Sequence, residues 1–411
     1  MERRDPSGSL ASLRERNRGR IVAELRRAGL ISRAELARRT GLSRSTVSTL
    51  VAELQARGLV SEREVDGAGP QGGRPPVLLG LERTAGAVLA IDFGKQHVRV
   101  LVADLAHAIL ADLEQPTETE QSATQGFDAA VALAEQALEE ARVAGRELIG
   151  VGLGVPGPIE NATGEVGSSS ILPGWIGIRP ADELQRRLHL PVATANDANL
   201  GALAELTWGA GRGVDDFVYV KVASGIGGGL VLGGELYTGA HGIAGEIGHS
   251  MVDEHGALCR CGNRGCLETV ASTRAVLELI DTARRREHDE QLTIEQVIAH
   301  ARDGDRACQR VIGDAARAIG VVVAQVCNAL NPAKVIVGGD LSAAGDVLLD
   351  PLRDELARHA VPAAGGDVEI VAGVLGRRAE VLGAAALVLR DADGFDGFTF
   401  TTAGEAQQQA G

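Results

Sequence analysis

Apolar residues recur at helical spacing in three short segments near the start of the chain. The three sets are Ile21, Val22 and Leu25, then Leu36 and Ala37, then Val47, Leu50, Val51 and Leu54. Gly41 and Gly58 follow the second and third sets, where glycine commonly ends a helix. Two short helices, a tight turn and a longer third helix are typical of a helix-turn-helix. A small helical module that binds another protein is the alternative.

Polar residues mark the starts of two of these helices. Ser32 with Glu35 three residues later predicts a capping box, and Ser43 can cap the third helix. The third helix opens with small hydroxyl side chains and one arginine, which suit entry into a DNA major groove. The candidate DNA contacts are Arg33, Ser43, Arg44, Ser45, Thr46 and Ser48.

Two short extended segments follow the third helix. Residues 59–66 and 77–81 predict paired strands, and the Gly- and Pro-rich stretch 69–76 predicts the loop between them. This hairpin is the wing of a winged helix. The sequence therefore predicts a winged helix-turn-helix domain over 13–81, preceded by a disordered tail at 1–12.

From residue 86 onward, apolar runs of strand length alternate with helical patterns. The expected strands are 87–92, 98–103, 149–154, 192–195, 218–222, 230–232 and 335–337, and the expected helices include 126–145 and 180–188. This alternation predicts an α/β fold in which helices cover the sheets. Asp314 and Arg317 interrupt the most apolar segment, 311–330, so it predicts a buried helix rather than a membrane span.

Charge divides the chain into a basic head and an acidic body. The whole sequence has a net charge of -14, whereas residues 1–80 contain 15 Arg, no Lys and 9 acidic residues. This division indicates that only the head meets a polyanion. Apolar residues are 45% of the chain and aromatic residues 2%, so cores of Ala, Val, Leu and Ile are expected. The charged start lacks the apolar run of a signal peptide, which predicts a cytoplasmic protein without membrane association.

Glycine-containing turns and one polar turn follow predicted strands. The stretches 155–158 and 224–229 leave room for a ligand or for phosphate oxygens, although the same composition also makes plain tight turns. Asp197, flanked by Asn196 and Asn199, can accept hydrogen bonds from polyol hydroxyls. In a kinase, Asp197 would take the proton of the attacking hydroxyl. Helix N-capping is the alternative role for this turn.

A cluster of metal-binding residue types lies at 249–266. The candidate ligands are His249, Cys259, Cys261 and Cys266. One histidine and three cysteines complete the closed tetrahedral shell of a structural Zn²⁺ site. A disulfide is the alternative, and His255 is a second candidate for the histidine ligand. Cys308 and Cys327 fall on predicted helices and are expected to be buried thiols.

Together these motifs resemble the ROK family of repressors, open reading frames and kinases, over residues 17–390. The resemblance implies a two-lobed actin/hexokinase-like (ribonuclease H-like) sugar-kinase fold over 86–392. The implied sugar contacts are Gly157, Asn196, Asp197, Glu246, His249 and Glu268. The implied nucleotide-side residues are Asp92, Gly94, Ser224, Gly225, Gly227, Gly338 and Gly339.

The first phosphate loop departs from the Asp-x-Gly-Gly-Thr pattern of the family's kinases. Here Gly94 is followed by Lys95 and Gln96, whose side chains fill space that phosphate and its metal would occupy. Binding of ATP and Mg²⁺ is therefore not expected, although the charge of Lys95 would still attract phosphate. With the winged head, this departure resembles the family's repressor branch, such as the xylose and N-acetylglucosamine repressors. Asp197 would then act only as a hydrogen-bond acceptor.

These features predict a sugar-responsive transcriptional repressor of carbohydrate-utilisation genes. A homodimer or a dimer of dimers would bind double-stranded operator DNA, and a small sugar between the lobes would change the spacing of the heads. An ATP-dependent sugar kinase with an added DNA-binding domain, using Asp197 as its base, is the alternative. A non-sugar adaptor is a third hypothesis. Residues 393–411 are expected to form a disordered tail.

Overall fold

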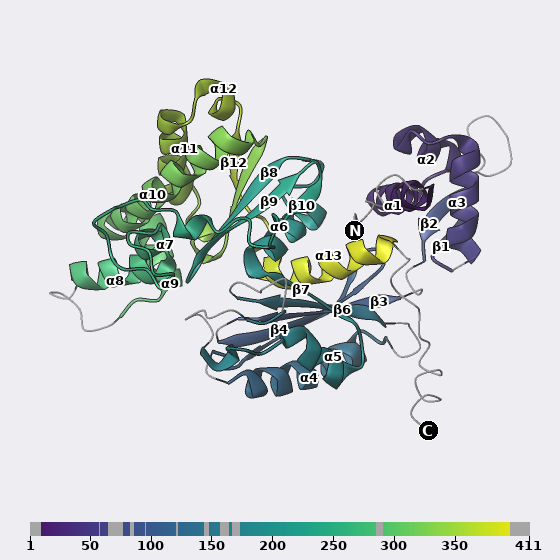
Figure 1. The fold of residues 1–411 in the computed structure, drawn as a ribbon, viewed down its shortest axis with the longest axis horizontal. Helices are drawn as coiled ribbons and strands as arrows, with labels where there is room; N and C mark the ends of the chain where they lie inside the picture. Colours follow the sequence, from purple (N-terminus) through teal and green to yellow (C-terminus); the bar gives the residue numbers. More distant parts are fainter. Residues whose placement is uncertain are drawn as a thin grey trace, which may run out of the picture.

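The computed structural model describes residues 10–56, 58–64, 77–82, 86–94, 96–120, 122–143, 148–156, 164–166, 173–284 and 291–394. Lys95 and Gly157 of the predicted site lie outside these ranges, as do the predicted wing tip and both chain ends. Within the described residues, the chain forms a small N-terminal head beside a larger body of two lobes (Figure 1).

The head has the predicted elements in the predicted order. They are α1 (Leu10–Ala28), α2 (Arg33–Thr40), α3 (Arg44–Ala56), β1 (Val60–Glu64) and β2 (Val77–Leu81). The two strands pair antiparallel, with Val60 opposite Leu81, and the three predicted apolar sets are buried in one core. Helix α1 begins inside the stretch expected to be a disordered tail, because Leu, Arg and Glu favour helix even where apolar spacing lapses.

The start of α2 has only half of the expected capping box. The Ser32 hydroxyl accepts a hydrogen bond from the Glu35 backbone N–H at 3.2 Å, as predicted. The Glu35 carboxylate, however, accepts from Arg39 at 2.7 Å, and the return bond to Ser32 is absent among the described contacts. A charge-assisted bond to arginine is stronger than one to a backbone amide, which explains the difference. Ser43 caps α3 as expected, accepting from the Thr46 N–H at 3.1 Å.

The first lobe is a five-stranded sheet in the order β5-β4-β3-β6-β7. Its strands are β3 (Ala87–Phe93), β4 (His97–Asp104), β5 (Ile109–Pro116), β6 (Leu148–Val155) and β7 (Val192–Asn196). Side chains alternate along β3: Leu89 and Ile91 pack in the core that contains α4 (Ala123–Glu140) and α5 (Pro180–Leu188). Val88 and Ala90 pack in the core that contains α13 (Ala379–Gly394). The sheet is therefore covered on both faces, as Figure 1 shows.

The second lobe is another five-stranded sheet, in the order β10-β9-β8-β11-β12. Its strands are β8 (Phe217–Val222), β9 (Ile226–Leu232), β10 (Glu235–Tyr237), β11 (Lys334–Gly338) and β12 (Glu369–Ala372). One face packs against α6 (Asp197–Trp208). The other packs against helices of the second lobe, seen above and to the left in Figure 1. They are α7 (Glu268–Ala271), α8 (Thr273–Arg284), α9 (Ile294–Arg302), α10 (Arg306–Leu330), α11 (Asp346–His359) and α12 (Pro362–Gly365).

Helices α6 and α13 pack against each other between the two sheets and so join the lobes. Their backbones approach so closely that a Cβ atom at Gly383 would lie 1.9 Å from the Leu200 carbonyl oxygen, so only glycine fits at this position. Helix α13 also packs on β3, β4 and β6, and on α1 of the head. Helix α13 therefore contacts the head and both lobes.

The glycine-rich stretch after β8 is mostly strand, whereas the sequence predicted a loop up to Gly229. Strand β9 begins at Ile226, and Gly229 lies opposite Tyr219 of β8. A Cβ atom at Gly229 would lie 2.5 Å from the Ala198 carbonyl oxygen of α6. These glycines therefore allow a helix to pack closely on the sheet, and only residues 223–225 form the turn.

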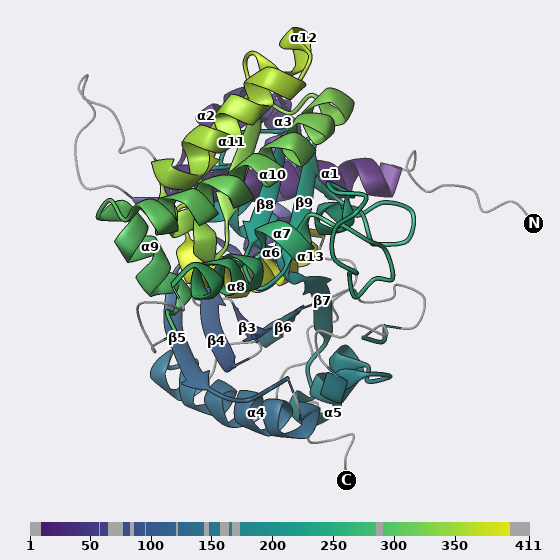
Figure 2. The same cartoon turned by 90° about the vertical axis from the view of Figure 1, so that its left-hand side faces the viewer.

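Helix α10 is long and apolar enough to cross a membrane by length and composition alone. In the structure, however, 61% of its apolar window is buried. It packs against α8, α9 and α11, as Figure 2 shows. It is the buried helix that the charges at Asp314 and Arg317 predicted.

Candidate ligand cleft and metal centre

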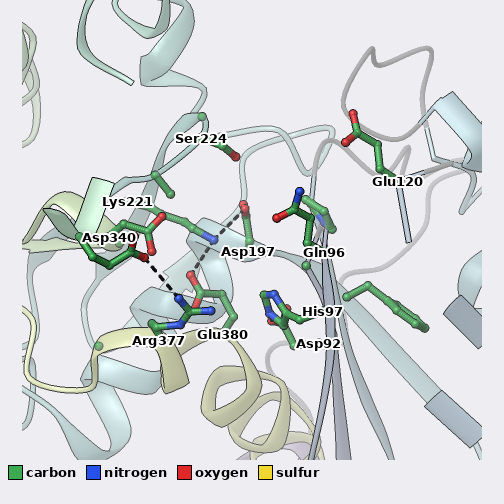
Figure 3. A pocket seen from close by; sticks show the side chains of 18 residues that line it. Asp92, Gln96, His97, Glu120, Asp197, Lys221, Ser224, Asp340, Arg377 and Glu380 are labelled. Carbon is green, nitrogen blue, oxygen red and sulfur yellow. Dashed lines mark hydrogen bonds and ion pairs between the residues drawn. The ribbon is translucent and has the colours of Figure 1, made fainter. Parts of the chain in front are cut away.

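A cleft of about 400 Å³ lies between the two lobes (Figure 3). The predicted site residues that line it are Asp92, Gly94, Gln96, Asp197, Ser224, Gly225 and Gly339. They come from the ends of β3, β8 and β11 and from the start of α6, which the fold brings to one place. The other described candidates do not line this cleft; they are Asn196, Gly227, Gly338, Glu246, His249 and Glu268.

A buried lysine lies at the centre of the cleft. The Lys221 ammonium is 2.9 Å from Oδ2 of Asp197 and 2.6 Å from Oε1 of Glu380. The three side chains come from β8, α6 and α13. Sequence analysis assigned no role to Lys221, a charge within an apolar strand, or to Glu380, which precedes the apolar run of α13. A lone lysine in a buried strand was the signal that would have identified the site.

Opposite charges keep this lysine protonated. Burial would lower the pKa of Lys221, but the carboxylates of Asp197, Glu380 and Asp92 together raise it well above its ordinary value. Burial raises the pKa of Glu380, and the Lys221 ammonium partly offsets that rise. The cleft therefore holds three carboxylates around one fixed ammonium.

Both oxygens of Asp197 are already in use. Oδ1 accepts a hydrogen bond from the Ala198 N–H at 2.8 Å, and Oδ2 accepts from Lys221. To remove a proton from a substrate hydroxyl, a base needs a free oxygen within hydrogen-bond reach. A substrate hydroxyl on Asp197 would therefore share its acceptor oxygen with the Lys221 ammonium or with the Ala198 N–H.

The turn after β3 is filled by a histidine. The His97 ring lies where a side chain at Gly94 would stand, since a Cβ atom there would be 2.0 Å from the ring. Its Nε2 atom is 3.4 Å from Oδ2 of Asp92, and this interaction raises the pKa of His97. Gln96 lines the cleft as expected, whereas Lys95 lies outside the described residues. His97 is thus a further bulky group at the predicted phosphate turn.

The predicted sugar-side carboxylates lie next to the metal loop. Oε2 of Glu246 is 3.7 Å from Nε2 of His249, and burial raises the pKa of Glu246 with help from Asp197 and Glu268. Glu268 forms an ion pair with Arg260, a residue that sequence analysis did not select. These carboxylates are close enough to influence one another and form one charged group beside the cleft.

Asn196 serves as the N-cap of α6. Its Oδ1 atom accepts a hydrogen bond from the Asn199 N–H at 2.8 Å. The capping alternative raised for this turn is therefore realised at Asn196. Asp197 is the first residue of the helix, so its carboxylate also lies at the positive end of the helix dipole.

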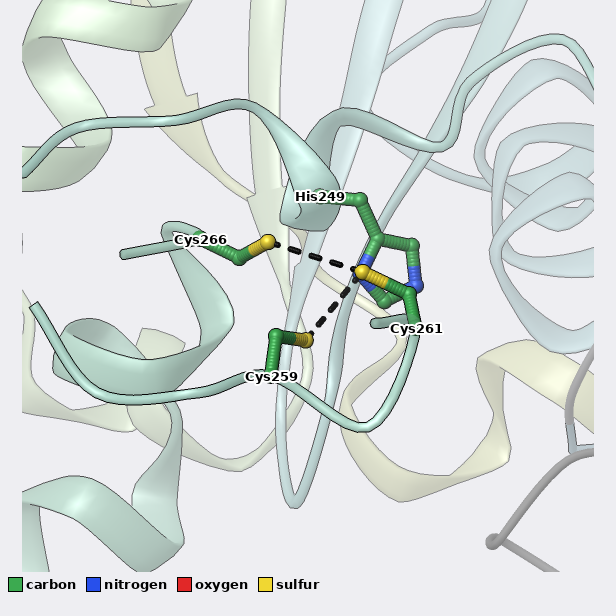
Figure 4. A group of neighbouring side chains, drawn as sticks. All are labelled: His249, Cys259, Cys261 and Cys266. Carbon is green, nitrogen blue, oxygen red and sulfur yellow. Dashed lines mark hydrogen bonds between the residues drawn. The ribbon is translucent and has the colours of Figure 1, made fainter. Parts of the chain in front are cut away.

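The four predicted metal ligands converge in a single group (Figure 4). One ligand atom from each of His249, Cys259, Cys261 and Cys266 lies within 4.8 Å of every other. The Cys261 and Cys266 Sγ atoms are 3.7 Å apart, and Cys259 Sγ is 3.6 Å from His249 Nδ1. Zn–S and Zn–N bonds of about 2.3 and 2.0 Å give tetrahedral S···S and S···N edges of about 3.8 Å and about 3.5 Å. The donor atoms and their spacing therefore fit a tetrahedral Zn²⁺ ion.

The alternatives for the cysteine loop do not fit the same geometry. The sulfur atoms of Cys261 and Cys266 are too far apart for a disulfide, and all five cysteines are free thiols. His255 is 88% exposed, is paired with Glu254 and lies outside the group. Gly262 and Gly265 both have positive φ, so they supply the two tight turns that bring the ligands together.

The head presents its candidate DNA contacts unequally. Ser43, Arg44, Ser45 and Ser48 are exposed; Ser43 caps α3, and the other three lie in the N-terminal half of the helix. Arg33 instead pairs with Glu62 of the wing at 2.7 Å. Arg44 has no ion pair among the described contacts. Arg44 is therefore the candidate whose guanidinium is available to a ligand.

A profile of the ROK family matches residues 88–391, and a MarR family profile matches residues 15–69. The xylose repressor of Caldicellulosiruptor bescii is 31% identical over 397 residues, which cover 93% of this chain and 98% of that repressor. A solved ROK family transcriptional regulator, a homologue of the Escherichia coli Mlc protein, is similar with a TM-score of 0.79 and 27% identity. That match covers 93% of this chain and 97% of the regulator.

A ROK family glucokinase from Streptomyces griseus, solved with glucose and AMPPNP, has a TM-score of 0.65 and 29% identity. It covers 74% of this chain, and 99% of the glucokinase is matched. The predicted winged helix-turn-helix and two-lobed kinase-like fold are thus confirmed by family profiles and by solved structures. The chain belongs to the ROK family.

Proposed function

We propose that this chain is a sugar-responsive transcriptional repressor. The observation that carries the proposal is the extent of the similarity: a xylose repressor matches 93% of the chain, head included, whereas a glucokinase matches 74%. The exposed start of α3 supports binding to the major groove of operator DNA, with Arg44 as the main base contact. We place its action in the cytoplasm, where that DNA is found.

The body would act as the sensor. A sugar or sugar derivative would bind in the cleft between the lobes with a hydroxyl on Asp197, and it would extend from the cleft to the neighbouring carboxylates of Glu246 and Glu268. Zn²⁺ held by the four-residue group would fix the loop that carries Glu246, and it would supply no step of a reaction. We propose domain limits of 13–81 for the head and 86–392 for the body.

Two copies of the chain would bind one operator. A dimer places two recognition helices in successive major grooves of a palindromic site, and the half-site spacing then depends on how the two heads are held. A sugar that changes lobe closure would change that spacing. A coupling free energy of about 1–3 kcal/mol between the two sites is enough for regulation.

The test combines DNA selection with calorimetry on the full-length, zinc-loaded protein. A random-sequence DNA pool gives the preferred site, and titrations with D-xylose, D-glucose and N-acetyl-D-glucosamine give the sugar. The expected result is a palindromic site whose affinity changes by about 5–150-fold at saturating sugar. Failure to select any DNA sequence, or an affinity that no sugar changes, would contradict the proposal.

A sugar kinase remains the second candidate, because Asp197, Ser224 and Gly225 all line the cleft. Two observations argue against a kinase: Asp197 forms an ion pair with Lys221, and the His97 ring lies against Gly94. A coupled assay for ADP release with each sugar, ATP and Mg²⁺ separates the two functions. Steady turnover proportional to protein concentration would favour the kinase.

A further inference from the structure

The ion pairs of Lys221 join three elements that are far apart in the sequence. Asp197 is the first residue of α6, Lys221 lies near the end of β8, and Glu380 lies in the first turn of α13. Figure 3 shows the ammonium between the two carboxylates, with dashed lines to each. The Lys221 and Glu380 side chains are only 15% and 10% exposed. A buried lysine with two carboxylate partners has a defined geometry, unlike a mobile surface pair.

A ligand hydroxyl on Oδ2 of Asp197 would share that oxygen with Lys221. Oδ1 of Asp197 accepts from the backbone of α6 and Oδ2 accepts from the Lys221 ammonium. A hydroxyl that donates to Oδ2 weakens the contact of Lys221 with Asp197. The ammonium then has Glu380 as its remaining close carboxylate partner, and the balance between α6 and α13 changes.

Helix α13 carries this change away from the cleft. Glu380 is the second residue of the helix, and most of the following residues from Val381 to Leu389 belong to one apolar core. The same core contains Ile21, Val22 and Leu25 of α1. Close packing makes such a core respond as a unit, because side chains in contact cannot move independently. A shift at the start of α13 is therefore felt by the first helix of the head.

We propose that Lys221 is the ligand-operated link between the cleft and the DNA-binding head. Without ligand, its ammonium ties Asp197 of α6 to Glu380 of α13. A sugar hydroxyl on Asp197 releases that tie, leaves Lys221 with Glu380, and so repositions α13 against α1. This inference rests on the proposed function, and it assigns the regulation to one lysine and one glutamate.

The experiment measures coupling rather than affinity alone. The DNA is the sequence selected from the random pool, and the sugar is whichever of D-xylose, D-glucose and N-acetyl-D-glucosamine binds the wild type. The DNA dissociation constant is measured with and without saturating sugar for the wild type, Lys221→Met and Glu380→Gln. Glu235→Gln is the matched control. Glu235 is an exposed residue of β10 that pairs with Arg390, near the end of α13 opposite to Glu380.

The wild type and Glu235→Gln are expected to show the same ratio of dissociation constants, about 5–150. For Lys221→Met and Glu380→Gln the ratio is expected to fall to within about twofold of 1. Calorimetry must show that Glu380→Gln still binds the sugar, and hydrogen exchange in α1 must no longer respond to it. Glu380→Gln keeps the shape of the side chain, so it carries the test if Lys221→Met does not fold.

Three results would overturn the inference. If both variants kept the wild-type ratio of DNA dissociation constants, Lys221 and Glu380 would not connect the cleft to the head, and the proposed function would be unaffected. Loss of sugar binding in Glu380→Gln would make Glu380 a ligand contact instead of a link. A wild type whose DNA affinity ignores all three sugars would contradict the proposed function itself, and with it the inference.

Discussion

The metal centre and the cleft are both groups of charged or ionisable side chains, yet they are built in different ways. All four metal ligands belong to residues 249–266, and two positive-φ glycines shape the turns between them. The central residues of the cleft are Asp197, Lys221 and Glu380, which three separate elements contribute. The metal group needs an added cation to balance its thiolates, whereas the cleft contains its own cation in Lys221.

Because of this difference, we expect the metal centre to stabilise one loop conformation and the cleft to change when a ligand binds. A closed ligand shell makes one arrangement strongly preferred, which suits a loop that must hold Glu246 in place. An ion pair between elements can exchange one partner for a ligand hydroxyl, which suits a sensor. Substitutions in the two regions are therefore expected to have different consequences.

The largest effect is expected at the metal centre. Cys259→Ala removes one of four ligands, and bound structural zinc contributes about 10–16 kcal/mol to folding in small zinc-finger peptides. We expect the variant to lose its metal and to become sensitive to proteolysis within 249–266. Elemental analysis measures the metal. Cys327→Ala, a buried thiol of α10, is the control and should keep one zinc per chain. Full zinc content in Cys259→Ala would exclude this thiol as a ligand.

The next effect is expected in the cleft. Lys221→Met leaves Asp197 and Glu380 without their cation, and removing one partner of a buried pair lowers the free energy of unfolding by about 3–5 kcal/mol. Burial already raises the pKa of Glu380, so the folded variant takes up a proton before the unfolded chain does. The loss should therefore shrink as the pH falls from about 7 to about 5.

Chemical denaturation at each pH measures this loss. The control is Arg274→Met, because the side chains of Arg274 and its partner Glu278 are both exposed, so its loss should be about 0–1 kcal/mol. If both variants lost the same free energy of unfolding, the ion pair in the cleft would contribute no more to stability than an exposed ion pair.

The third prediction concerns the candidate DNA contacts of the head, which, like the metal ligands, lie close together in the sequence. Arg44→Ala should weaken binding to the selected DNA by about 1–3 kcal/mol, since a guanidinium on a guanine edge contributes about this much. Arg33→Ala should have a smaller effect, because Arg33 is engaged with Glu62. Fluorescence anisotropy gives both affinities. A larger loss for Arg33→Ala would reverse the assignment of the base contact.

The smallest effect concerns a histidine that the fold buries beside Trp208. Burial, with Arg26 and Arg212 nearby, lowers the pKa of His107 to about 2. The unfolded chain protonates this histidine below about pH 6.5 while the folded protein does not, so stability falls with pH by up to about 1.4 kcal/mol per unit. His107→Phe keeps an aromatic ring against Trp208 and should remove this part of the slope. The exposed His255→Phe should leave the slope unchanged.

Short-range patterns were sufficient for the head and the metal loop. Helical spacing identified all three helices of the head, because an amphipathic helix must turn its apolar stripe toward the core. The spacing of His249 and the three cysteines identified the ligand set, because one histidine and three thiolates complete a tetrahedral shell and here all four fall within one short segment. Both conclusions depend on residues that are close in the sequence.

Only the tertiary structure decided which residues meet in the cleft. Gly227 and Gly229 have the composition of a phosphate loop, yet they serve the packing of β9 on α6, which no local pattern could reveal. Lys221 and Glu380 are 159 positions apart in the numbering, and nothing near either residue in the sequence indicates the other as its partner. Their pairing exists because α13 returns to pack beside α6, and burial then requires that each charge find a partner.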